Sequence, residues 1–163
     1  SLSAVTVYGG TGRALVIRLK HGRRPDLARP LGTWMAVLAH RRRLTGPNTV
    51  VVPVGPWPAH TLKRGYSAPV LLAREVARRT GTGWIPDLLV RVRPPGDPHG
   101  SRRERAEAAR EAWTLRRPGR VSGRDVLLVD DVVTTGATVS EASRLLIRAG
   151  ARQVDVLALA RVD

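Results

Sequence analysis

Two adjacent acids and a cluster of small hydroxyl residues stand together in the segment DVLLVDDVVTTGAT, residues 125–138. Asp130 and Asp131 end an apolar run, and the threonines around Gly136 follow directly. Paired carboxylates can accept hydrogen bonds from vicinal hydroxyls or lie near a hydrated Mg²⁺. A glycine–threonine loop that opens a helix suits a phosphate monoester, because backbone amides and the positive end of the helix dipole meet there. These residue types predict a site for a ribose 5-phosphate, whereas the plainer alternative is an ordinary turn with surface acids and a threonine-capped helix.

The position of this segment in the fold depends on the strands and helices that alternate along the chain. Short apolar runs rich in β-branched residues predict strands buried on both faces, and apolar residues at helical spacing predict the helices between them. We expect strands at 48–54, 125–131 and 153–162, a weaker strand near Leu88–Val92, and helices over 67–79, begun by Ser67, and from 138 to a stop at Gly150. This alternation predicts an α/β fold with a mainly parallel sheet. Ligands of such sheets lie beyond the carboxyl ends of the strands, where residues 130–138 would be.

An additional helix is expected upstream, in the segment RPDLARPLGTWMAVLAHRRRL. Asp26 stands where a helix cap would be, and Pro30 would lie in the first turn. Trp34 falls at the same helical spacing as the neighbouring leucines, which predicts a place for it in the core.

Residues 126–138 resemble the phosphoribosyl-pyrophosphate (PRPP) signature of type I phosphoribosyltransferases. The wider chain, from YGGTGRALVIRLKHGRR through LKRGY to LALAR, is similar to the competence-protein ComF group of that superfamily. The resemblance implies the type I phosphoribosyltransferase fold, in which helices flank a mainly parallel sheet on both faces and a mobile loop closes the site. It also implies a single domain over residues 1–163 that lacks the N-terminal zinc segment of the group.

The same resemblance implies a role for each part of the site. The acids would hold the ribose hydroxyls and approach the metal only indirectly, through Mg²⁺ bound to PRPP. The 5′-phosphate would lie on residues 134–138, and the turn after the strand at 48–54 would meet the pyrophosphate. The PRPP-binding residues would be Asp130, Asp131, Val132, Val133, Thr134, Thr135, Gly136, Ala137 and Thr138. The pyrophosphate would contact Val54, Gly55, Lys63 and Arg64, and the mobile loop at 93–110 would bring His99, Arg102, Arg103 and Arg105.

Several positions depart from the ComF pattern. Arg-Gly-Phe-Asn-Gln is usual in the group, and this chain has Tyr66, Ser67 and Ala68 in the last three places. The mobile loop has Asp97 and Ala108 where the group carries a glutamine and an asparagine. Two functions therefore remain open. The first is Mg²⁺-dependent transfer of ribose 5-phosphate from PRPP to a base or amine. The second is a non-catalytic protein that senses PRPP or a nucleotide, or binds single-stranded DNA.

Composition limits the partners and the setting. The 163 residues suit one domain, and no window reaches the length of a membrane span. The absence of cysteine excludes disulfides, thiolate zinc sites and a cysteine nucleophile. With no secretory leader in the sequence, we expect a cytoplasmic protein without a membrane partner; a homodimer is left open.

The charge of the chain has two explanations. A formal charge of +15 suits a nucleic-acid or polyphosphate partner. The alternative is compositional, because Lys20 and Lys63 are the only lysines and the many arginines would then be scattered over solvated faces. The two lysines also hint that arginine does not fit at their positions.

Overall fold

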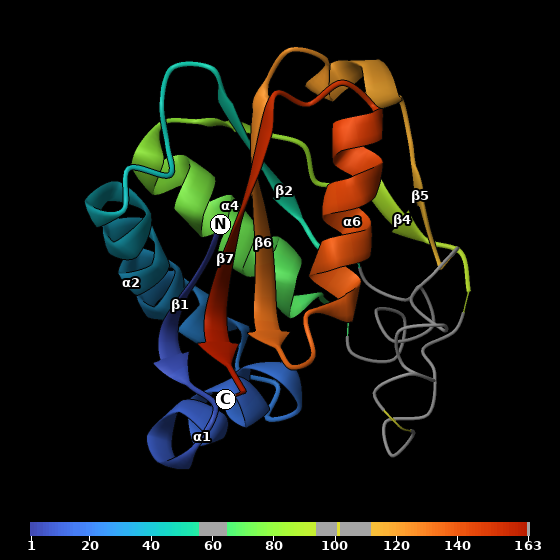
Figure 1. Ribbon diagram of the computed structural model, residues 1–163. Helices are drawn as coiled ribbons and strands as arrows, with labels where there is room; N and C mark the ends of the chain where they lie inside the picture. Colours follow the sequence, from blue (N-terminus) through green and yellow to red (C-terminus); the bar gives the residue numbers. More distant parts are fainter. Residues whose placement is uncertain (56–64, 94–100, 102–111, 163) are drawn as a thin grey trace.

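A parallel sheet of five strands forms the centre of the molecule. The computed structural model describes residues 1–55, 65–93, 101 and 112–162. The strands are arranged in the order β1-β7-β6-β2-β3, and every neighbouring pair is parallel (Figure 1). Their bounds are β1 Leu2–Val7, β2 Thr49–Pro53, β3 Gly83–Trp84, β6 Asp125–Val133 and β7 Gln153–Arg161.

The three central strands are those that the apolar runs predict. Val52 of β2 pairs with Leu128 of β6, and Val129 of β6 pairs with Leu157 of β7. All five residues of β2 are buried, as are six consecutive residues in each of β6 and β7. Such strands are buried on both faces because helices cover both sides of a parallel sheet. The predicted neighbourhood of these strands, and with it the α/β fold class, is confirmed.

Helices cover the two faces unequally. Three lie on one face, α1 Gly10–Lys20, α2 Ala28–Arg41 and α4 Ala68–Thr80, whereas α6 Ala137–Arg148 lies on the other (Figure 1). Met35 and Leu72 pack with Leu127 of β6 on the three-helix face. Val139 and Leu146 pack with neighbouring β6 residues on the α6 face. None of the helices within the described ranges is long and apolar enough to cross a bilayer.

A small antiparallel sheet lies beside α6. It pairs β4, Leu89–Arg91, with β5, Trp113–Leu115. The strand expected near Leu88–Val92 therefore exists, but it belongs to this second sheet and not to the parallel one. Short 3₁₀ turns at Pro25–Leu27 and Pro118–Val121 complete the described elements.

Two expectations about the helix at 28–41 are wrong. Trp34 is 52% exposed, because the face of α2 that meets the sheet carries Leu31 and Met35 instead. Asp26 does not cap the helix: its carboxylate accepts hydrogen bonds from the Arg24 side chain at 2.7 and 2.8 Å, and Leu27 is the residue before the first turn. Helical spacing predicts the helix here but does not show which side of it a neighbouring strand covers.

The predicted ends of the other two helices agree better with the structure. Ser67 is the residue before α4 and has extended backbone, although its hydroxyl makes no capping hydrogen bond. Gly150 follows α6 with φ of 90°, a left-handed conformation that stops the helix and favours glycine.

Candidate phosphoribosyl site

The acidic pair, Asp130 and Asp131, lies near the carboxyl end of β6. Both are buried, with 8% and 3% of their surfaces exposed. Successive side chains of a strand point to opposite faces of the sheet, so the two carboxylates diverge. Asp131 faces the three-helix side, where its Oδ1 lies 2.8 Å from Nζ of Lys20. Asp130 turns towards the side of α6, while its Oδ1 accepts a hydrogen bond of 2.8 Å from the Asp131 amide.

Burial controls the charge of this pair. It raises the pKa of Asp130 from 3.8 to about 8, and the negative charge of Asp131 contributes in the same direction. The ammonium group of Lys20 opposes the shift but does not cancel it. Oδ2 of Asp131 is also buried and has no hydrogen-bond partner among the described residues. The pair thus presents one acceptor oxygen, Oδ2 of Asp131, that has no partner among the described residues. It also presents the carboxyl group of Asp130, whose ionised form a nearby cation or hydrogen-bond donor would stabilise.

Lys20 is the site residue that sequence reasoning missed. It ends α1, and its side chain is 29% exposed. The preceding residue, Leu19, is fully buried, and its carbonyl accepts a hydrogen bond from the hydroxyl of Tyr66. Tyr66 stands where the ComF pattern has phenylalanine, so this contact is a consequence of that departure. The only sequence signal for Lys20 was the rarity of lysine in an arginine-rich chain.

The phosphate loop, residues 134–138, leads from β6 into α6. Gly136 precedes the helix with φ of 77°, a left-handed conformation that glycine adopts without steric cost. The first helical hydrogen bond runs from the Ser140 amide to the Gly136 carbonyl at 2.9 Å, so the amides of 137–139 precede it. Thr135 Oγ1 accepts a long hydrogen bond of 3.4 Å from the Ala137 amide. No acidic side chain stands in the first turn of α6, which leaves its positive end available to an anion.

A second turn lies beside the acidic pair. The Val54 amide donates to the Val129 carbonyl at 2.8 Å, so the chain leaving β2 runs alongside β6. A Cβ at Gly55 would lie 2.1 Å from the backbone oxygen of Leu89 and 3.5 Å from the ring of Trp113. Only glycine fits this close approach. The turn at 54–55 therefore lies beside the carboxyl half of β6, as expected, while a shared site with the loop after β6 stays a prediction.

Other predicted site residues lie outside the described ranges. They are Lys63 and Arg64 after the second turn, and His99, Arg102, Arg103 and Arg105 of the mobile loop. The departure at Ser67 and Ala68 can be described. Ala68 packs in the core of the three-helix face, and the Ser67 hydroxyl is buried without a hydrogen-bond partner among the described residues.

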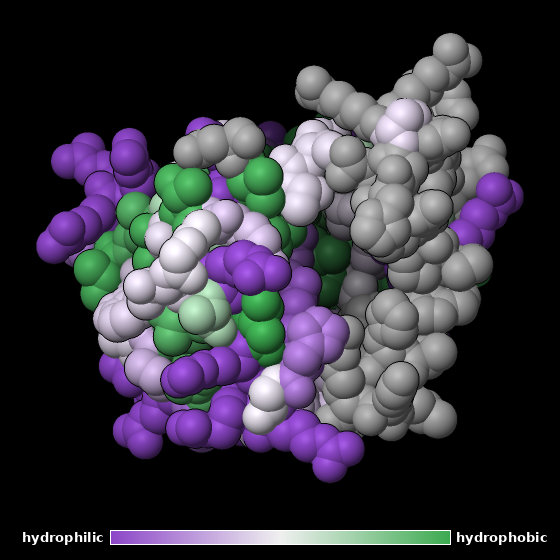
Figure 2. All heavy atoms as spheres, turned by 90° about the horizontal axis from the view of Figure 1, so that it is seen from below, coloured by the Kyte–Doolittle hydropathy of each residue, from purple (hydrophilic) through white to green (hydrophobic). Residues whose placement is uncertain are grey.

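All the described site elements converge on one end of the molecule. The strands β1, β7, β6 and β2 finish there, α1 lies across that end, and α6 begins there (Figure 1). Figure 2 views this end directly and shows hydrophilic and hydrophobic side chains side by side over the described part of the chain.

Comparison with known proteins agrees with this geometry. Residues 68–162 match the model of the phosphoribosyl transferase domain. This range contains the acidic pair and the phosphate loop and covers more than half of the chain. The chain belongs to the phosphoribosyltransferase family. Within it, the chain is 35% identical over 166 residues to the DNA utilization protein YhgH of Escherichia coli, an alignment that covers 98% of this chain and 71% of that protein.

One further relative and two solved structures are similar to this chain. Competence protein F of Haemophilus influenzae is 31% identical over 113 residues, which are 68% of this chain and 49% of that protein. An adenine phosphoribosyltransferase structure superposes with a TM-score of 0.55 at 17% identity and covers 86% of this chain and 73% of the other. The allosteric regulatory enzyme of purine biosynthesis superposes with a TM-score of 0.58 at 22% identity over 88% of this chain, which spans only 30% of that enzyme. These structures show the shared fold.

The donor set suits a metal that arrives with its substrate. Among the described residues, no cluster of three or more histidine or carboxylate side chains could hold an ion. Mg²⁺ in such sites is held by one or two carboxylates and by substrate phosphates. The acidic pair, with its unoccupied Asp131 oxygen, fits that arrangement.

Proposed function

We propose that this protein binds PRPP with Mg²⁺ and transfers ribose 5-phosphate to a nitrogenous acceptor. The observation that carries the proposal is the buried acidic pair, followed within a few residues by the open N-terminus of α6. One half of this arrangement accepts hydrogen bonds from a diol, and the other half donates them to a phosphate. Together the two halves offer the acceptors and the donors that a ribose 5-phosphate requires.

Each described residue has a distinct task in this reaction. Oδ2 of Asp131 would accept a hydrogen bond from a ribose hydroxyl. Lys20 forms an ion pair with Oδ1 and thereby fixes the orientation of the carboxylate. The amides of 137–139 would bind the 5′-phosphate. The turn at Gly55, which the close approach of the Leu89 carbonyl restricts to glycine, would place its backbone beside the pyrophosphate.

The chemistry requires stabilised charge and no nucleophilic side chain. As the bond from C1 of the ribose to pyrophosphate breaks, the sugar gains oxocarbenium character, which the acidic pair would stabilise. Bound Mg²⁺ would neutralise the departing pyrophosphate. The acceptor nitrogen then forms the new bond to C1 and releases its proton to solvent.

The proposal is tested by calorimetric titration with PRPP in the presence and absence of Mg²⁺, followed by a pyrophosphate-release screen over bases and amines. We expect Mg²⁺-dependent PRPP binding and release of pyrophosphate with at least one acceptor. Absence of PRPP binding would overturn the proposal.

A second candidate function is PRPP or nucleotide binding without transfer. The specific observation in its favour is the departure at Ser67 and Ala68, which leaves a buried hydroxyl at the start of α4 without a hydrogen-bond partner among the described residues. The relative called a DNA utilization protein and competence protein F both direct attention to DNA handling. PRPP binding without pyrophosphate release for any acceptor would favour this second function.

The pH dependence of PRPP affinity should report the state of Asp130. Its pKa of about 8 leaves the carboxyl mostly protonated at neutral pH, whereas Mg²⁺-bound PRPP favours the ionised form. Affinity should therefore rise by up to about tenfold per pH unit from pH 6 to pH 8 and level off above it. PRPP titrations at intervals of about half a pH unit measure this dependence. The Asp130→Asn variant, which should show a flatter profile, separates the effect of Asp130 from that of the ionisation of PRPP itself. Identical profiles for both proteins would assign the titration elsewhere.

A further inference from the structure

The end of the molecule opposite the phosphoribosyl site carries a concentration of arginines. The strands β2, β6 and β7 begin there, and α2, α4 and α6 end there, as the upper part of Figure 1 shows. Backbone contacts join these segments: the Gly123 amide donates to the Gly150 carbonyl at 2.7 Å, and the Arg152 amide to the Arg124 carbonyl at 2.8 Å. We call this surface the basic edge. It comprises Arg41, Arg42, Arg43, Arg78, Arg79, Arg116, Arg117, Arg120, Arg124, Arg148 and Arg152.

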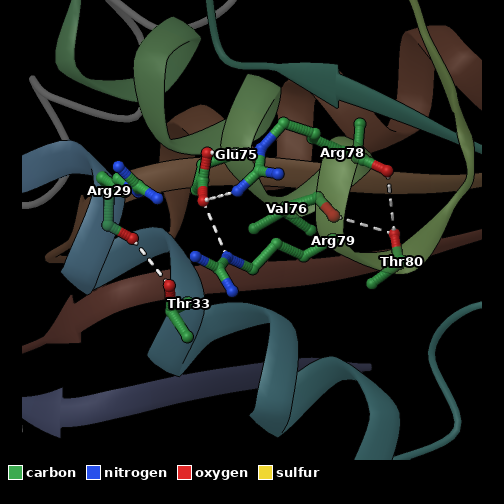
Figure 3. Close-up of polar contacts among 8 residues, drawn as sticks. Arg29, Thr33, Glu75, Val76, Arg78, Arg79 and Thr80 are labelled. Atoms are coloured by element: carbon green, nitrogen blue, oxygen red, sulfur yellow. Dashed lines mark hydrogen bonds and ion pairs between the residues drawn. The ribbon is translucent and has the colours of Figure 1, made fainter.

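Few carboxylates offset this charge. Glu75 pairs with both Arg78 and Arg79 at 2.7 Å (Figure 3), and Asp125 pairs with Arg152. Asp87 lies 3.9 Å from Arg120. Within the described ranges, no ion pair with a carboxylate is formed by the remaining arginines, which are Arg41, Arg42, Arg43, Arg116, Arg117, Arg124 and Arg148.

Helix dipoles account for only part of this arrangement. Each of the three helix ends carries about half a negative charge, which a single arginine offsets. The surplus repels itself and lowers the stability of the folded state. Arg43 and Arg117 also adopt left-handed backbone, with φ of 54° and 52°, where glycine would relieve the strain. Arg23, outside the basic edge, has the same backbone conformation with φ of 49°, so the argument for this surface rests on its charge and not on the strain.

The shape of the surface suits an extended polyanion. A groove of about 390 Å³ runs between the last turns of α2 and α4, and Arg41, His40 and Arg79 line it. The hydroxyls of Thr33 and Thr80 in this groove already donate to backbone carbonyls, and Arg79 is paired with Glu75, as Figure 3 shows, so Arg41 is the cation of the groove that has no carboxylate partner among the described residues. Adjacent strands lie about 4.8 Å apart, so the beginnings of β7, β6 and β2 together span roughly 10 Å, and the helix ends on the two faces of the sheet widen this surface.

We propose that the basic edge binds nucleic acid through its phosphate backbone, at a site separate from the PRPP site. Arginine suits phosphate because its planar guanidinium donates two parallel hydrogen bonds. Contacts to phosphates do not distinguish one base from another, so little sequence preference is expected. This inference goes beyond the proposed phosphoribosyl transfer and does not depend on it.

The test removes one unpaired arginine from each of three segments of the edge. The edge variant is Arg42→Gln/Arg117→Gln/Arg148→Gln. A control variant, Arg29→Gln/Arg74→Gln/Arg144→Gln, loses the same charge from exposed positions elsewhere. Fluorescence anisotropy with a labelled 20-nucleotide single strand and the matching duplex measures affinity over a range of salt concentrations. Each phosphate contact contributes about fivefold in affinity at 0.1 M salt, so three contacts contribute about 100-fold.

The edge variant should bind at least tenfold more weakly than the wild type, with a salt slope shallower by about 2, and the control less than threefold more weakly. Saturating PRPP with Mg²⁺ should not displace the oligonucleotide. An equal loss in the control variant, displacement by PRPP, or a loss confined to Arg102→Gln/Arg103→Gln/Arg105→Gln would overturn the proposal. So would binding to phosphatidylglycerol vesicles in place of oligonucleotides. PRPP titration of the edge variant keeps the two sites distinguishable, because its PRPP affinity should equal that of the wild type.

Discussion

Replacing Gly55 with alanine is expected to destabilise the protein by about 1–3 kcal/mol and to abolish measurable PRPP binding. The added Cβ would lie 2.1 Å from the backbone oxygen of Leu89. This oxygen belongs to the backbone and not to the end of a flexible side chain, so the turn after β2 or the strand β4 must shift. That turn is hydrogen-bonded to β6 one residue before the acidic pair, and its displacement would disturb the proposed pyrophosphate contact. Chemical denaturation and calorimetric PRPP titration measure the two effects.

The matched control for this substitution is Gly119→Ala. A Cβ at Gly119 meets no atom within 4 Å, and the residue lies at the opposite end of the molecule in the turn at Pro118–Val121. Its stability should change by less than about 0.5 kcal/mol, as for other surface substitutions. If Gly55→Ala lost stability but bound PRPP with wild-type affinity, the turn after β2 would not belong to the site.

The second large effect is expected at the acidic pair. Asp131→Asn should weaken PRPP binding by at least about 1 kcal/mol, or fivefold, because a charged hydrogen bond to a ribose hydroxyl becomes a neutral one. The same change removes the ion pair with Lys20. Asp125→Asn is the matched control, since Asp125 begins the same strand and lies at its far end. Its PRPP affinity should equal that of the wild type.

A double-mutant cycle separates the role of Lys20 from that of Asp131. If Lys20 acts by orienting the Asp131 carboxylate, Lys20→Met should weaken PRPP binding. The double variant Lys20→Met/Asp131→Asn should then bind no worse than the weaker single variant. Fully additive losses would mean that Lys20 contacts the ligand by itself. Unchanged affinity in Asp131→Asn would remove Asp131 from the ribose site.

Local patterns were sufficient to predict the elements that carry the candidate site. These patterns are the apolar run before Asp130, the glycine at 136 and the apolar spacing after it. All of them lie in one continuous stretch of the sequence. Strand, turn and helix there depend on backbone geometry and burial, which neighbouring residues largely determine. Parallel packing then follows from the alternation of strands and helices, and it brings the ends of β2 and β6 to one edge.

Contacts between distant segments needed the tertiary structure. Trp34 has helical spacing but lies on the exposed face of α2, because the sheet covers the opposite side. The strand β1 was not expected, since it is formed by pairing with β7 at the far end of the chain.

The sequence by itself determined the α/β class, the acidic pair and the phosphate loop, since each is a local pattern with a physical meaning of its own. Only the tertiary structure decided that Lys20 reaches Asp131 across 111 positions of sequence. It also gathered the arginines of four separate segments on one edge. A net charge states the excess of cations over anions in a chain, and the arrangement of the cations depends on where the fold brings the ends of its helices and the beginnings of its strands.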